Sequence, residues 1–235
     1  MRPQDNYPKV LVAIPIYEGK EYMFKENFKC IKELDYPNYD YIYIDNSEYT
    51  SYYYKLKKRD CNVVHVDREG NSRQALTNAQ NYARQKAIEE GYDYLMFIES
   101  DLTPPKDAIT RLMNHELPVV GGTYFIGTGD IKTLCVFFTR QNKQGIWGTV
   151  PIMPKDVKEF LNTGLRRVHG IGLGCTLIRR DLFTRFNFWT DERFDNKHSD
   201  VYFYMDLWNA QIPVHVDTNF LVPHYPSDWS KVKDK

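Results

Sequence analysis

The chain has 235 residues, 42% of them hydrophobic, which is enough to bury the core of one large domain or two small ones. Lysine plus arginine equals aspartate plus glutamate at 31 each, and this zero net charge argues against a protein whose main partner is nucleic acid or an acidic membrane. Four scattered cysteines predict reduced thiols in a reducing compartment. The N-terminus does not resemble a signal peptide, and no apolar run reaches about 18 residues. We therefore expect a cytoplasmic protein without a transmembrane segment, which is either free in the cytoplasm or peripheral at a membrane.

The first half of the chain alternates strand-like and helix-like segments. Short apolar runs rich in β-branched residues predict strands, and apolar residues at helical spacing predict helices. We expect strands over 9–17, 40–47, 61–67, 94–98 and 118–125, and helices over 19–34, 72–90 and from Pro104 and Pro105 onward. This alternation predicts a mostly parallel sheet flanked by helices.

The second half is richer in strand-like segments. Residues 133–139, 148–153 and 168–178 suggest strands, and helices are expected near 180–186 and 200–210. No linker rich in glycine, serine or proline separates the halves. We therefore expect one α/β domain over 1–235, with added antiparallel strands in its second half.

Polar residues follow three of the expected strands, in the segments 15–18, 45–47 and 99–101. Ligands of open α/β sheets bind at the carboxyl ends of the strands, and two carboxylates in a short turn suit Mg²⁺ or Mn²⁺. A helix N-cap is the simpler interpretation of Asp101 taken alone. Three polar strand ends at one edge favour the ligand site.

Eight segments, in the order in which they occur along the chain, resemble motifs of the GT-A glycosyltransferases, which have a Rossmann-like fold. The resemblance is strongest to the inverting family 2 of these enzymes. The similarity covers about Lys9 to Tyr225. The segments are V-A-I-P-I-Y (12–17), I-Y-I-D-N-S (42–47), the glycine-containing turn and helix start at 68–79, Glu-Ser-Asp (99–101) in the place of a D-x-D motif, V-V-G-G-T-Y-F (119–125), the glycine-rich 169–183, 198–212 with its Ser-Asp, and P-H-Y (223–225).

The resemblance implies a metal-dependent transfer of a sugar from a nucleoside diphosphate sugar, by default a UDP-sugar, to a hydroxyl acceptor with inversion. Asp200 would be the catalytic base. Asp101 and His224 would bind Mn²⁺ or Mg²⁺, Glu99 would face the ribose or the metal, and Asp45 would meet the nucleobase. Residues 9–117 would form the nucleotide-binding half and 118–225 the acceptor-binding half, followed by a tail at 226–235.

The remaining donor-site candidates also follow from the resemblance. They are Pro15, Tyr17, Glu18, Arg68, Arg73, Asn78, Ser100, Gly121, Gly122 and Gly172.

Simpler explanations stay open for several candidates. Asp200 could be a helix cap, His224 could be structural, and Arg73 could be a solvated helix charge. Tyr17 could pack in the core, and the glycines could serve turns or bulges.

Two departures from the family pattern matter. Glu-Ser-Asp replaces the D-x-D motif, and Ser-Asp replaces an E-D motif, so Asp200 should have less help in raising its pKa. The absence of a Q-x-x-R-W segment argues against a typical processive polysaccharide synthase.

Alternative functions remain at this level. A haloacid-dehalogenase-type phosphatase, a sugar nucleotidyltransferase, a retaining glycosyltransferase and a non-catalytic module that binds nucleotide sugar or glycan each share part of the pattern. The acceptor could be a glycan, a lipid-linked sugar, a protein, a small molecule or a modified nucleobase.

Overall fold

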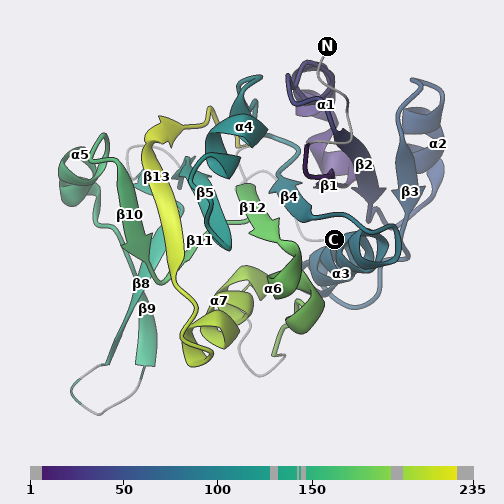
Figure 1. Cartoon of the computed structure of the whole chain (residues 1–235). Coiled ribbons are helices and arrows are strands. Elements are labelled where there is room, and N and C mark those ends of the chain that lie inside the picture. The colour runs from purple at the N-terminus through teal and green to yellow at the C-terminus, as the bar shows by residue number, and fades with distance from the viewer. Residues whose placement is uncertain (1–6, 128–131, 142, 144–146, 192–197, 227–235) are drawn as a thin grey trace.

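An eight-stranded sheet runs through the whole molecule (Figure 1). The structure, a computed structural model, describes residues 7–127, 132–141, 143, 147–191 and 198–226. The strand order is β10-β13-β5-β12-β4-β1-β2-β3. The strands of this sheet are β1 Val10–Ile16, β2 Tyr39–Asp45, β3 Val63–His65, β4 Tyr94–Ile98, β5 Val119–Thr123, β10 Leu165–Val168, β12 Cys175–Arg179 and β13 Val214–Leu221.

Most neighbours in this sheet are parallel. β1 pairs in parallel with β2 and β4, β2 with β3, and β13 with β5, whereas β12 and β10 run antiparallel to their partners. The mostly parallel α/β sheet expected from the sequence is confirmed. The sheet takes strands from both halves of the chain, since β12 and β13 lie beside β4 and β5.

Helices cover both faces of the sheet. The helices are α1 Glu21–Lys32, α2 Ser51–Lys57, α3 Ser72–Glu89, α4 Ala108–Met113, α5 Val157–Phe160, α6 Arg180–Arg185 and α7 Ser199–Asn209, with the short 3-10 turns η2 Glu18–Lys20 and η3 Pro154–Asp156.

Alternation along β1 explains the two layers. Successive side chains of a strand point to opposite faces. Leu11 and Ala13 belong to the hydrophobic core that includes residues of α3, α6 and α7, and Val12 and Ile14 belong to the core that includes residues of α1, α2 and α4. Both faces of β1 are therefore buried, as its apolar run predicts.

Smaller antiparallel elements extend the second half. β8 Val136–Gln141 pairs with β9 Trp147–Pro151 and β11 Gly170–Ile171, and β6 Phe125–Ile126 pairs with β7 Thr133–Leu134. In Figure 1 the β8–β9 pair projects away from the central sheet. These strands confirm the added antiparallel structure.

Several local expectations differ from the structure, and the helices α2 and α5 were not expected. The strand-like run 168–178 is divided among β10, β11 and β12, since glycines interrupt it. Pro104 and Pro105 precede α4, which begins at Ala108. β13 was not expected, although it pairs with both β5 and β10. Among the described residues, no helix is long and apolar enough to cross a membrane.

Candidate active site

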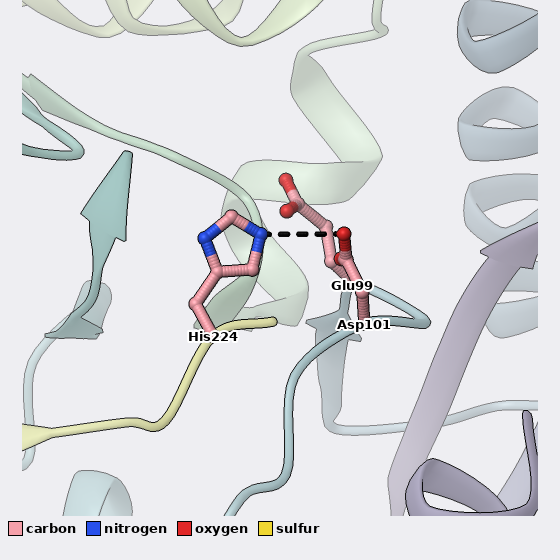
Figure 2. A group of neighbouring side chains, drawn as sticks. All are labelled: Glu99, Asp101 and His224. Carbon is pink, nitrogen blue, oxygen red and sulfur yellow. Dashed lines mark ion pairs between the residues drawn. The ribbon is translucent and has the colours of Figure 1, made fainter. Parts of the chain in front are cut away.

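Glu99, Asp101 and His224 come together where β4 ends. The chain after β13 runs beside the turn that follows β4, because Leu102 and His224 form a β-bridge and Tyr225 N–H donates to the Asp101 carbonyl at 3.0 Å. One potential ligand atom from each of the three side chains lies within 4.8 Å of the other two. Figure 2 shows the imidazole facing the Asp101 carboxylate, with Glu99 beside it. The metal-site candidates are thus neighbours in space.

The hydrogen bonds of His224 fix the role of its two ring nitrogens. Nδ1 lies 2.6 Å from the carbonyl oxygen of Phe125, which can only accept, so Nδ1 carries a proton. Nε2 lies 3.3 Å from Asp101 Oδ2. Burial lowers the pKa of His224, but hydrogen bonding with Asp101 and Phe125 outweighs it and the pKa is raised. Nε2 can donate a proton to Asp101 or offer a lone pair to a cation, in the orientation typical of a metal-bound histidine.

The two oxygens of Asp101 have different surroundings. Oδ2 accepts from the Lys20 ammonium and from the Tyr22 hydroxyl at 3.4 Å. Oδ1 is buried and has no hydrogen-bond partner among the described residues. Burial raises the pKa of Asp101, yet His224 and Lys20 outweigh it, so the pKa is lowered and the group is anionic. A buried, charged oxygen without a partner is what a cation ligand requires.

Glu99 completes the group. Its Oε1 accepts from the Tyr124 hydroxyl at 3.3 Å, and that hydroxyl accepts from the Gly174 N–H at 3.1 Å. Burial, followed by the negative charge of Asp101, raises the pKa of Glu99 to about 7. A carboxylate that is hard to ionise beside another carboxylate gains from a nearby cation. The residues present therefore fit a divalent ion.

Asp200 lies at the second position of α7, close to this group. Its Oδ1 accepts from the Val201 N–H at 2.7 Å, while the N-cap residue of the helix is His198. The charge of Asp200 is one of the causes that raise the pKa of Glu99. Burial raises the pKa of Asp200 itself. Burial therefore raises the pKa of Asp200 although the acidic neighbour of the E-D motif is missing.

Asp45 is sealed within its own hydrogen-bond network. Its side chain has an exposed fraction of 0%. Oδ1 accepts from Ser47 N–H at 3.1 Å and Ser47 Oγ–H at 2.5 Å, and Oδ2 faces His65 Nδ1 at 2.8 Å. Ser47 Oγ in turn accepts from the Glu18 N–H at 3.0 Å. The network links the carboxyl ends of β1, β2 and β3.

Lys20, Tyr22 and His65 were missed by the sequence reasoning. His65 is a polar residue at the end of a strand, like the three polar segments that indicated the site. The pattern V-V-H therefore contained a signal for it. Lys20 had no such signal, because nothing in the local pattern shows that η2 turns its side chain toward the end of β4.

Other donor-site candidates lie close to these groups. Pro15 lies within β1, opposite Ile44 of β2, and Ser100 is buried between Glu99 and Asp101. The Tyr17 ring covers the position that a side chain would take at residue 19. Burial raises the pKa of Tyr17, and the charges of Lys20 and Asp101 also act on it.

Arg68, Arg73 and Asn78 lie around the start of α3. Arg68 is exposed. Arg73 Nε is buried, with no hydrogen-bond partner among the described residues. Asn78 accepts from Gln74 Nε2 at 2.8 Å, and Asn71 caps the helix by accepting from the N–H groups of residues 73 and 74. The interactions of Asn78 and of the Arg73 N–H are internal to this segment.

Gly121, Gly122 and Gly172 are packed against protein atoms. A Cβ at Gly121 would overlap Ile171, and one at Gly172 would overlap the Tyr124 hydroxyl. A Cβ at Gly122 would lie 2.8 Å from a ring carbon of Phe220. Internal packing is thus a sufficient reason for glycine at all three positions.

Comparisons with known proteins give a family and a fold. The model of the family described as "Glycosyl transferase family 2" matches residues 11–186. No curated protein matches the sequence. Among solved structures, "GalNAc-T7 with UDP, GalNAc and Mn2+" is similar with a TM-score of 0.62 and 14% identity, over 95% of this chain and 44% of that chain.

A second similar structure is S. aureus TarS 1-349. It has a TM-score of 0.54 both alone and in complex with UDP, with 15% and 16% identity, over 91% of this chain and 59% of that chain. This chain therefore spans about half the length of these two solved chains, 44% and 59%. At these identities the likeness shows a shared fold.

Proposed function

Since this chain belongs to glycosyl transferase family 2 and is a nucleotide-sugar glycosyltransferase of the GT-A fold, we propose that it performs a metal-dependent transfer to a hydroxyl acceptor with inversion. The observation that carries the proposal is the group of Glu99, Asp101 and His224, whose ligand atoms lie within 4.8 Å of one another. The family membership leaves the phosphatase and nucleotidyltransferase alternatives without support.

Asp101, His224 and Glu99 would hold the Mn²⁺ or Mg²⁺. Asp101 Oδ1 lacks a partner among the described residues, and His224 has its Nδ1 proton committed to Phe125. When bound there, a divalent cation neutralises the charge that develops on the leaving diphosphate.

Asp200 is the proposed base. As the acceptor oxygen bonds to the anomeric carbon and the bond from that carbon to the diphosphate breaks, the acceptor proton moves to the Asp200 carboxylate. Its raised pKa supports this role, because a base with a higher pKa accepts a proton more readily. Attack from the side opposite the leaving group inverts the anomeric carbon.

A UDP-sugar is the proposed donor. The support is the structural likeness to GalNAc-T7, whose structure contains UDP, GalNAc and Mn²⁺, and to TarS, which has a structure with UDP. Asp45 would act on the nucleobase side by holding Ser47 and His65 in place. The donor side further includes Pro15, Tyr17, Glu18, Arg68, Arg73, Asn78 and Ser100.

The acceptor and the cellular location are broader proposals. Residues 118–225 would bind the acceptor, which is a glycan, a lipid-linked sugar, a protein, a small molecule or a modified nucleobase. A reducing, cytoplasmic compartment agrees with the free thiols of all four cysteines.

The test is a panel of UDP-sugars with Mn²⁺ and simple sugar acceptors, with release of UDP as the readout and the product anomer determined by NMR. Asp200→Asn should bind donor as the wild type does and lose transfer by at least about a hundredfold, in the range of general base contributions. Asp107→Asn, at an exposed position before α4, is the matched control. An active Asp200→Asn enzyme would remove Asp200 as the base, and a product with retained configuration would favour the retaining mechanism.

A further inference from the structure

Lys20 places a positive charge inside the group proposed to bind the metal. It lies in η2, directly after β1, where its backbone N–H donates to the Tyr17 carbonyl at 2.9 Å. Its ammonium is paired with Asp101 Oδ2, and the exposed fractions of the two side chains are 12% and 1%. A lysine this buried is unusual unless its charge is matched.

The ammonium and the proposed metal would bind the same carboxylate, because Lys20 pairs with Asp101 Oδ2 and Oδ1 has no hydrogen-bond partner among the described residues. Asp101 Oδ2 is also the atom that His224 Nε2 faces at 3.3 Å. A cation shared by Asp101 and His224 would therefore lie beside the Lys20 ammonium. Two positive charges so close in a buried site repel strongly.

The charge of Lys20 reaches a second carboxylate of the group. It is one of the causes that oppose the rise in the pKa of Glu99. Lys20 thus already supplies part of the neutralisation that a divalent ion would give to Glu99 and Asp101. The geometric basis is the pairing of the ammonium with Asp101 Oδ2.

We propose that Lys20 is a counter-ion switch: it pairs with Asp101 before the donor binds, yields that carboxylate to the divalent ion, and then pairs with the donor's diphosphate. The proposal rests on the proposed function, because it needs a metal and a nucleoside diphosphate at this site. It assigns to Lys20 a role in donor binding and in the order of assembly.

The diphosphate is the fitting second partner for the ammonium. Lysine binds phosphate as a point charge on a flexible four-carbon stem. A displaced ammonium in a buried site needs another anion, since an unpaired buried charge is costly. The diphosphate that the metal would bridge brings that anion to the same place.

The switch makes the binding of metal and nucleotide cooperative. Metal alone must take Asp101 from Lys20 without supplying another anion, whereas metal with nucleotide supplies the diphosphate. Linkage requires the effect to be reciprocal, so each ligand raises the affinity for the other by the same factor.

The test measures Mn²⁺ affinity from the electron paramagnetic resonance signal of free Mn²⁺, with and without UDP. The variants are Lys20→Met, Lys20→Arg and the control Lys25→Met, at an exposed position of α1. Without UDP, we expect Lys20→Met to bind Mn²⁺ about tenfold more tightly than wild type, within the usual range of coupling effects. UDP should raise the Mn²⁺ affinity of wild type and Lys25→Met strongly, of Lys20→Arg similarly, and of Lys20→Met much less.

A Lys20→Met protein that binds Mn²⁺ no more tightly than wild type contradicts the switch. If wild type binds both Mn²⁺ and UDP, that result refutes the switch alone. If wild type binds neither ligand, the proposed function fails together with the switch.

A second measurement uses only wild-type protein and decides the matter if Lys20→Met does not fold. The acetylation rate of the Lys20 amine is followed by mass spectrometry. Saturating Mn²⁺ alone should speed the labelling, because Lys20 leaves Asp101, and added UDP should slow it again. An unchanged rate in Mn²⁺-saturated protein would overturn the proposal.

Discussion

Two buried carboxylates at the same edge of the sheet have opposite surroundings. Asp45, at the end of β2, has both oxygens engaged by Ser47 and His65. Asp101, after β4, has one oxygen crowded by positive and polar groups and another with no hydrogen-bond partner among the described residues.

The difference separates scaffold from ligand site. A carboxylate whose hydrogen bonds are complete within the protein stabilises the fold, and one left incomplete is available to a ligand. Asp45 fixes the relative positions of three strand ends. Asp101 has an oxygen without a hydrogen-bond partner among the described residues, which can bind a cation. Mutations at the two positions should therefore differ in kind.

The largest expected effect is on stability at Asp45. Asp45→Ala removes the hydrogen-bond partner of Ser47 and His65 in a buried site, and the free energy of unfolding should fall by about 3 kcal/mol, the upper range for hydrogen bonds to a charged group. Urea unfolding followed by circular dichroism measures this, with Asp107→Ala as the exposed control. A loss below about 1 kcal/mol, together with lost nucleotide binding, would mean that Asp45 contacts the ligand directly. Asp45 would then not be a scaffold residue.

His224 should show the opposite behaviour. His224→Gln should weaken Mn²⁺ binding in the presence of UDP by about a hundredfold, the upper range seen when groups that support a metal site are lost. The melting temperature should change less than in Asp45→Ala, because His224 Nδ1 donates to one carbonyl, that of Phe125, whereas both oxygens of Asp45 are engaged. Calorimetric titration of Mn²⁺ measures the affinity. A variant that unfolds as Asp45→Ala does, with unchanged Mn²⁺ binding, would place His224 in the scaffold.

Gly172 tests whether packing alone accounts for a glycine of the segment 169–183. A Cβ there would overlap Tyr124, whose hydroxyl donates to Glu99. Gly172→Ala should cost about 2 kcal/mol, typical of overpacking, and should also perturb Glu99. Thermal unfolding checks the cost, and Gly148→Ala, where a Cβ would meet open space, is the control. Equal stability of the two variants would contradict close packing at Gly172.

The smallest expected effect is the pH dependence of a third carboxylate. Asp217 of β13 is paired with Arg111 Nε at 2.9 Å. Burial raises the pKa of Asp217, but Arg111, the Asn219 N–H and His115 outweigh it, so the pKa is lowered. A lowered pKa gives stability that is present above the unfolded pKa of about 4 and is lost as the pH falls through the folded pKa.

The measurement is the free energy of unfolding of wild type and Asp217→Asn between about pH 3 and pH 7. The difference between the two proteins should be about 1 kcal/mol near neutrality, typical of a partly exposed pair, and should shrink on acidification. A difference that grows toward low pH would show the wrong sign.

The sequence was a good guide wherever buried strands are continuously apolar. β1 and β4 were predicted for that reason, and with them the turn that carries Glu99 and Asp101. β13 was missed because its pattern is mixed: Asp217 and Thr218 are polar yet buried, and their partners lie far away in the sequence. Pairing of β13 with β5 cannot be derived from local periodicity.

The site shows the same limit. His224 was predicted from a resemblance, and its contact with Asp101 depends on how the chain after β13 returns to β4. Lys20 depends on the direction of one side chain in a 3-10 turn, which no pattern encodes. The pKa of Asp200 depends on burial, which one neighbour in sequence could not reveal.

The most direct test of the account is the melting temperature with UDP, GDP, CDP and dTDP, each with and without Mn²⁺, for wild type, Asp101→Asn and the control Asp107→Asn. A ligand that binds only the folded state raises this temperature by mass action. We predict a rise for UDP that requires Mn²⁺, that persists in Asp107→Asn and that disappears in Asp101→Asn. No rise with any nucleotide, or a full rise in Asp101→Asn, would contradict a metal-dependent donor site at the end of β4.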